Sequence, residues 1–118
     1  MADYGLFIGF GVPVRGRERQ ALKVFSEFFD YCSRLEQGGE IEGFEPALLE
    51  PHGGELSGFF LLRGERDKIS RVRGSEEFDR QVARGELLVE NLGVVGAFMG
   101  TRLMSQMSVF AEQVEELT

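Results

Sequence analysis

The chain uses one local pattern twice. An apolar run that ends in Arg-Gly and leads into a charged helix start occurs as GLFIGFGVPVRGRERQAL and again as SGFFLLRGERDKI. Corresponding helix positions, such as Arg19 and Arg66 or Leu22 and Ile69, are separated by the same 47 residues. A strand–helix unit repeated in this way predicts two consecutive β-α-β segments, and this constrains the architecture more than any motif in the chain.

Four apolar stretches are predicted to be strands: residues 6–14, 41–49, 56–63 and 93–100. The first and third are apolar on both alternating sets of positions, which predicts strands that are buried on both faces. The second contains Pro46, and a proline cannot donate to a ladder, so this strand is predicted at a sheet edge. The turn sequence at residues 51–54 joins the second and third strands as a hairpin.

Helices are predicted between the strands and at the end of the chain. Residues 18–35 carry apolar side chains at helical spacing, and Gly38-Gly39 stops them. Residues 67–92 are helical but interrupted at Gly74 and Gly85, with Ser75 as the N-cap of a new helix. The most regular helix, 102–117, has a narrow apolar stripe at coiled-coil spacing: Leu103, Met107, Phe110, Val114 and Leu117.

This order of elements predicts a single α+β domain over residues 1–118. Right-handed crossovers place the first and third strands at the centre of a four-stranded antiparallel sheet and the second and fourth strands at its edges. The result is a ferredoxin-like βαββαβ fold with an additional C-terminal helix.

The predicted sheet has no polar face. In a lone ferredoxin-like sheet one face meets water, and an apolar face of several hundred Å² is a liability on a monomer. A second copy of the chain, packed on this apolar face in a two-fold dimer, would cover it. The alternative is that the C-terminal helix folds over its own sheet. We favour a homodimer, with the C-terminal helix helping to clasp it.

The strand–helix order, the doubly apolar sheet and the hairpin followed by Ser75-Glu76-Glu77-Phe78 resemble the dimeric α/β-barrel superfamily. That superfamily includes cofactor-independent monooxygenases, stress-responsive barrel proteins and small bacterial proteins without an assigned activity. The resemblance is architectural and covers most of the chain. It implies a homodimer and brings no active-site signature with it, and function does not follow from fold alone.

Composition excludes several classes of partner. The net charge of −7 argues against binding nucleic acid or anionic membranes, which both attract positive charge. Cys32 is the only cysteine, so no intrachain disulfide forms and a reducing, cytoplasmic location is expected. It lies on the apolar face of its helix, where a thiol acts as a small hydrophobe. With one histidine and one cysteine, no zinc cluster and no cofactor are predicted, although a lone histidine could ligate an added metal or haem.

Three residues are candidate ligand contacts. Arg15 and Arg63 each close a predicted central strand, and on the premise that these two strands run parallel, both arginines emerge at one end of the sheet. There they would bind a carboxylate or phosphate beside helix N-termini. The alternative is that they pair with Glu18, with Glu65 or with solvent. His52, the only histidine, is either a general base or an exposed turn residue.

Two functions remain open from the sequence. The first is a dimeric barrel protein without catalytic activity that binds a small anionic or aromatic ligand. The second is a cofactor-independent monooxygenase acting on an electron-rich aromatic substrate, which needs an apolar pocket and a few convergent polar groups. A cavity beneath the helices favours the enzyme, whereas a filled interior favours a structural role.

Overall fold

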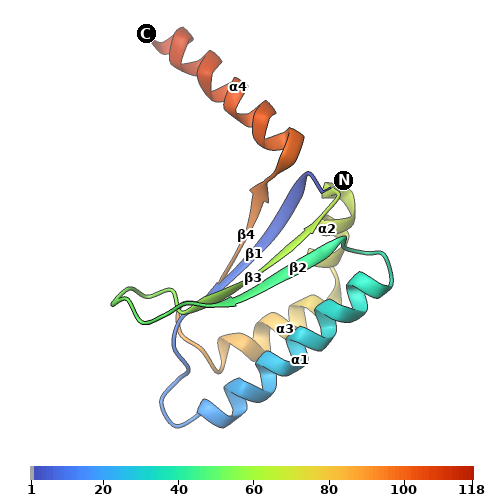
Figure 1. Cartoon of the computed structure of the whole chain (residues 1–118). Coiled ribbons are helices and arrows are strands. Elements are labelled where there is room, and N and C mark those ends of the chain that lie inside the picture. The colour runs from blue at the N-terminus through green and yellow to red at the C-terminus, as the bar shows by residue number, and fades with distance from the viewer. Residues whose placement is uncertain (1) are drawn as a thin grey trace.

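The computed structural model describes residues 2–118 and consists of one sheet with three helices packed on one of its faces (Figure 1). The bounds of the elements, in chain order, are β1 Tyr4–Phe10, α1 Glu18–Gln37, β2 Gly43–Leu48, β3 Gly58–Gly64, α2 Arg66–Arg73, α3 Glu76–Glu86, β4 Gly93–Phe98 and α4 Gly100–Leu117. The strand order is β2-β3-β1-β4, and each neighbouring pair is antiparallel. The predicted ferredoxin-like arrangement is confirmed, with the strand containing Pro46 at an edge.

Short-range chemistry sets the helix boundaries. α1 stops at Gly38, and Gly39 follows with a left-handed φ of 75°, a conformation that glycine adopts without a steric penalty. Ser75 caps α3, because its Oγ accepts a hydrogen bond from the Phe78 N–H at 3.2 Å. These two predictions are confirmed.

The first strand and the segment before the last strand differ from the prediction. β1 ends at Phe10 rather than near residue 14, and residues 87–92 are not helical. Beyond Phe10 the two segments bond to each other: the Gly11 N–H donates to the Glu90 carbonyl at 2.7 Å, and the Val14 N–H donates to the Leu88 carbonyl at 2.8 Å. Pairing with a distant loop therefore replaces both the strand extension and the helical turn.

The core lies between the sheet and helices α1, α2 and α3. Leu6 and Leu62 from the central strands are fully enclosed, and they pack beside Cys32 of α1 and Ile69 of α2. Phe60 stands edge-on to Phe28 of α1, with ring centroids 4.8 Å apart. This face of the sheet, with its helices, is the interior of the protein.

The opposite face, which we call the open face, is also apolar. Strand register places residues 5, 7 and 9 of β1 beside residues 59, 61 and 63 of β3 and residues 93, 95 and 97 of β4. Phe7 and Phe59 stack on this face with ring centroids 5.2 Å apart, and Val95 is 57% exposed. The predicted doubly apolar sheet is therefore present.

Helix α4 does not cover the open face. It leaves the end of β4 and extends away from the rest of the molecule (Figure 1). None of its residues is buried. The alternative in which the C-terminal helix folds over its own sheet does not occur in this structure.

Candidate functional site

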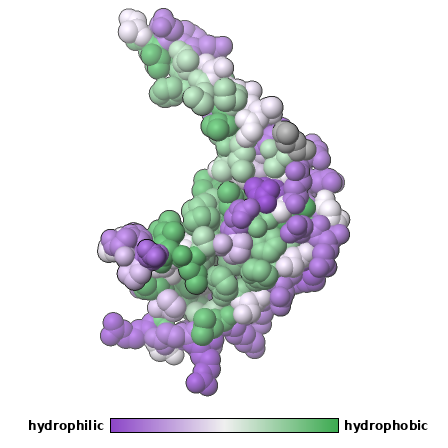
Figure 2. Space-filling model, in the orientation of Figure 1, coloured by the Kyte–Doolittle hydropathy of each residue, from purple (hydrophilic) through white to green (hydrophobic). Residues whose placement is uncertain are grey.

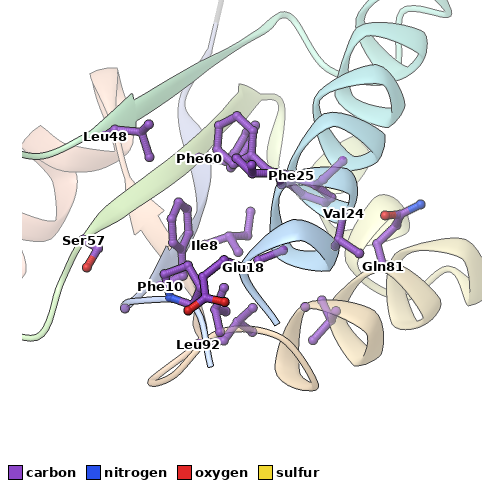
Figure 3. Close-up of a pocket in the computed structure, with 18 residues that line it drawn as sticks. Ile8, Phe10, Glu18, Val24, Phe25, Leu48, Ser57, Phe60, Gln81 and Leu92 are labelled. Carbon is purple, nitrogen blue, oxygen red and sulfur yellow. The ribbon is translucent and has the colours of Figure 1, made fainter. Parts of the chain in front are cut away.

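A cavity of about 380 Å³ lies between the sheet and helices α1 and α3 (Figure 3). The sheet contributes Ile8, Phe10 and Phe60, and α1 contributes Phe25. One side of the wall comes from α3 and from the 87–92 segment, whose pairing with residues 11–14 fixes that side of the cavity. Its volume falls in the range of about 300–1,000 Å³ that is typical of small-molecule sites.

The cavity wall is almost entirely hydrophobic. Eighteen residues line it, and its only polar side chains are those of Glu18, Ser57 and Gln81. Phenylalanines make up a large part of the remainder: Phe10, Phe25, Phe28 and Phe60. Aromatic walls of this kind suit an apolar or aromatic ligand that is oriented by a few polar contacts.

Gln81 is the most unusual of the three polar residues. It lies on the inward side of α3, between Phe78 and Val82, and its Oε1 is buried with no hydrogen-bond donor among residues 2–118. An unpaired buried polar atom costs roughly 1–3 kcal/mol. The terminal torsion of a glutamine side chain is soft, so its amide can turn toward a ligand in the cavity.

Of the described residues that line the cavity, Glu18 alone is charged. It begins α1, and its Oε1 accepts a hydrogen bond from the Gly16 N–H at 3.1 Å. This bond holds the carboxylate at the end of the helix that borders the cavity. The side chain is exposed, so its charge acts at the rim of the cavity rather than in the interior.

The predicted shared anion site of Arg15 and Arg63 does not form, because the premise that the central strands run parallel is wrong. β1 and β3 are antiparallel, and Arg63 faces Gly5 near the start of β1, whereas Arg15 follows the end of that strand. From Gly5 to Phe10 alone the strand spans about 17 Å. Because hydrogen bonds to an anion reach only about 3 Å, one small anion cannot contact both arginines.

Arg63 lies on the open face, away from the cavity. Its Nη2 donates to Glu45 Oε1 at 3.0 Å across the β2–β3 pair, so Arg63 pairs with a glutamate, but not with Glu18 or Glu65, the partners named from the sequence. The guanidinium lies over Gly43, where any side chain would collide with it. Arg15 is exposed in the turn that precedes α1.

His52 is an exposed residue of the β2–β3 loop. Its Nδ1 accepts from the Gly54 N–H at 3.1 Å, and its Nε2 lies 2.7 Å from the Leu56 carbonyl, to which it donates as the neutral Nε2–H tautomer. Both ring nitrogens therefore stabilise the loop. His52 does not line the cavity.

Sequence reasoning missed the residues that do line the cavity. Gln81 offered the clearest signal, since it is a polar residue within the apolar face that Phe78, Val82 and Gly85 define at helical spacing. Cys32 was placed correctly: it is fully buried, and burial raises the pKa of its thiol to about 12, which keeps it unreactive. No group of three or more histidine, cysteine or acidic residues within residues 2–118 could hold a metal ion.

Comparison with solved structures supports the ferredoxin-like fold. The chain is similar to a dimeric protein of unknown function and ferredoxin-like fold from Bacteroides fragilis, with a TM-score of 0.59 and 13% identity over 81% of this chain and 96% of that one. It is also similar to SnoaB, a cofactor-independent oxygenase from Streptomyces nogalater, with a TM-score of 0.53 and 16% identity over 84% of this chain and 93% of that one. The fold is ferredoxin-like.

Sequence comparisons add no closer relationship. No family model matches the chain. No curated protein matches it significantly. Within residues 2–118, none of the helices combines the length and the hydrophobicity needed to cross a bilayer.

Proposed function

We propose that the protein is a homodimer in which each copy binds one small, predominantly apolar aromatic ligand between its sheet and helices α1 and α3. The observation that carries this proposal is the cavity of about 380 Å³ with an aromatic wall and three polar side chains. From the sequence, a cavity beneath the helices favours the enzyme over a structural role, and such a cavity is also what ligand binding without catalysis requires. The dimeric state of the similar protein from Bacteroides fragilis and the apolar open face support the homodimer.

The ligand is neutral rather than anionic. Among residues 2–118, Glu18 is the only charged residue that lines the cavity, and none of the lysines or arginines does. An anion in the cavity would meet this carboxylate with no compensating positive charge. A ligand that carries a hydroxyl or N–H group would in addition donate to Gln81 Oε1, which has no donor among the described residues.

The test uses two fluorescent probes that differ by one charge. N-phenyl-1-naphthylamine is neutral and carries one N–H, whereas its 8-sulfonate is the same molecule with an anionic group. We expect the neutral probe to bind at least threefold more tightly at low salt and Glu18→Gln to reduce this ratio, because a charge at the rim is only partly screened. Equal affinities for the two probes would contradict the assigned ligand charge.

Blocking variants locate the binding. Ala21→Phe fills the cavity from α1 and Val82→Phe fills it from α3, and both residues line it. We expect either variant to lose most binding of the neutral probe while retaining its far-ultraviolet circular dichroism. If both variants fold and bind the probe as tightly as the unchanged protein, the ligand site is elsewhere and the proposal fails.

A cofactor-independent monooxygenase is the second candidate, and the aromatic cavity together with the similarity to an oxygenase fold favours it. Glu18 is the only carboxylate of the cavity wall and would have to deprotonate a phenolic substrate. Oxygen uptake with a dihydroxynaphthalene that depends on the protein and is lost in Glu18→Gln would support this activity. Binding of that phenol without oxygen uptake would leave the protein a binding protein.

A further inference from the structure

Helix α4 has the side chains of a packed helix, but residues 2–118 provide no partner that buries them. Its apolar residues at coiled-coil spacing, which we call the arm stripe, are Leu103, Met107, Phe110, Val114 and Leu117. They are between 46% and 86% exposed. At 100° per residue, Glu112, Glu115 and Glu116 lie on the other side of the helix, so α4 is amphipathic.

The ends of α4 do not stabilise it as an isolated helix. Met99 at the N-cap provides no side-chain hydrogen bond, and the first turn contains no acidic residue. Glu115 and Glu116 stand at the C-terminal end, where the helix dipole disfavours negative charge, and the last turn contains no basic residue. In proteins, most helical stability comes from packing of an amphipathic face rather than from intrinsic propensity. The stability of α4 must therefore come from packing of the arm stripe.

The base of α4 is fixed to the rest of the molecule. Arg102 Nε donates to Asp3 Oδ2 at 2.7 Å, and Gly100 adopts a left-handed φ of 53° within contact distance of the N-terminal backbone. The helix projects away from α1, α2 and α3, and together with the body it encloses a hollowed surface with many hydrophobic residues (Figures 1 and 2). The radius of gyration is 16.2 Å, against about 13.5 Å for a compact chain of this length.

The size of this surface fits a second copy of the chain. Four strands of about 20 Å length with a 4.8 Å spacing give the open face a footprint of about 400 Å². A stable interface needs at least about 500 Å² per partner and usually about 800 Å². An 18-residue helix adds a strip about 27 Å long and 10 Å wide, or about 270 Å². With α4 included, the contact area per partner rises from below this minimum to above it.

We propose that α4 is an exchanged arm: the arm stripe of each copy packs on the other copy, which occupies the hollow between that arm and the open face. This inference rests on the homodimer proposed above and names the segment that holds it together. Two-fold symmetry makes the exchange reciprocal, so both arms and both open faces are covered in a closed pair.

The experiment compares two pairs of substitutions in α4 that add the same charge. Met107→Glu with Phe110→Glu places charge on the arm stripe, whereas Ser105→Glu with Ser108→Glu places it on the opposite side of the helix. Neither pair touches the buried core, because no residue of α4 is buried. By sedimentation equilibrium, we expect the first pair to raise the dimer dissociation constant at least 100-fold and the second pair to raise it less than threefold.

The outcomes separate the arm from the rest of the proposed function. A dimer whose dissociation constant is the same with and without the stripe substitutions would overturn the exchanged arm and leave the homodimer standing. An unchanged protein that is monomeric at 100 µM would overturn both. Growth into open polymers would contradict a closed reciprocal pair. Binding of N-phenyl-1-naphthylamine should persist in all α4 variants, because the cavity lies on the other face of the sheet.

Discussion

At the scale of single residues, side chains of the same type have different roles because the sheet separates them. Arg15 and Arg63 occupy similar places in the two sequence repeats. Arg63 and Gly64 are the last two residues of β3, whereas Arg15 and Gly16 lie in a turn after β1. Glu18 and Gln81 carry no motif, yet the packing of α1 and α3 places both at the cavity. Cys32 is the clearest case of a residue whose chemistry is set by its surroundings.

Burial of Cys32 predicts an alkaline loss of stability. Burial raises the pKa of its thiol from the ordinary 9.0 to about 12, so the folded state keeps a proton that the unfolded state releases. The resulting contribution is fully present below pH 9 and is lost as the pH rises toward 12, at about 1.4 kcal/mol per pH unit. We expect the free energy of unfolding, measured in urea, to fall by about 1 kcal/mol from this group between pH 8 and pH 10.

The variant Cys32→Ala isolates this effect. Burial also raises the pKa of Tyr31, so the unchanged protein has more than one source of alkaline sensitivity. Cys32→Ala should lower stability at pH 7 by leaving a cavity, but its free energy of unfolding should decline less steeply above pH 9. Identical slopes for the two proteins would show that the thiol does not contribute.

At the scale of elements, glycines at positive φ and caps decide where helices begin and end. Gly39 at φ 75° terminates α1, and Gly100 at φ 53° redirects the chain from β4 into α4. The last strand, predicted over residues 93–100, therefore ends at Phe98 in the structure. The direction of α4 depends on this single left-handed residue and on the ion pair between Arg102 and Asp3.

Gly100→Ala tests this dependence. A Cβ at this position would lie 2.9 Å from the Ala2 carbonyl oxygen, in a conformation that costs L-residues roughly 1–2 kcal/mol. We expect the variant to lose about that free energy of unfolding and to dimerise more weakly than the unchanged protein. Gly16→Ala is the control, because Gly16 is also left-handed, at φ 89°, and its Cβ would have no neighbour within 4 Å, but it lies in the turn before α1 and not on the proposed interface. Equal effects of the two substitutions on dimerisation would contradict a special role for Gly100.

At the scale of the whole molecule, one sheet serves two purposes. The face toward α1, α2 and α3 forms the core and the cavity, and the open face with α4 forms the proposed interface. Phe60 and Leu61 are neighbours in β3 but belong to different faces; Phe60 is 2% exposed and Leu61 is only partly buried. With the proposed interface on the open face, we expect substitutions one residue apart to separate folding from assembly.

Glutamate at these two positions should have different consequences. Phe60→Glu buries an unpaired carboxylate among Phe25, Phe28 and Phe44, which costs several kcal/mol and is comparable with the whole stability of such a protein. We expect it to unfold the chain. Leu61→Glu should give a folded monomer that still binds N-phenyl-1-naphthylamine. Circular dichroism and light scattering distinguish the two results, and a dimeric Leu61→Glu variant would place the interface elsewhere.

The sequence by itself determined the element order, the strand order, the edge position of Pro46, the Ser75 cap and the doubly apolar sheet. Each follows from local rules: side-chain alternation, helical spacing, the missing N–H of proline and the connection rules of right-handed crossovers. It also placed Cys32 in the core, because the apolar face of a long helix is readable without knowing what it packs against.

Only the tertiary structure decided which side chains meet. The antiparallel register of β1 and β3 separated Arg15 from Arg63, and pairing of residues 11–14 with 88–90 shortened β1 and built one wall of the cavity. The position of α4, away from its own sheet, could not be predicted from the arm stripe. An apolar stripe indicates that a helix packs against something, but it does not identify the surface on which the helix packs. Contacts between residues far apart in the chain depend on the packing of whole elements, and short-range sequence patterns do not carry that information.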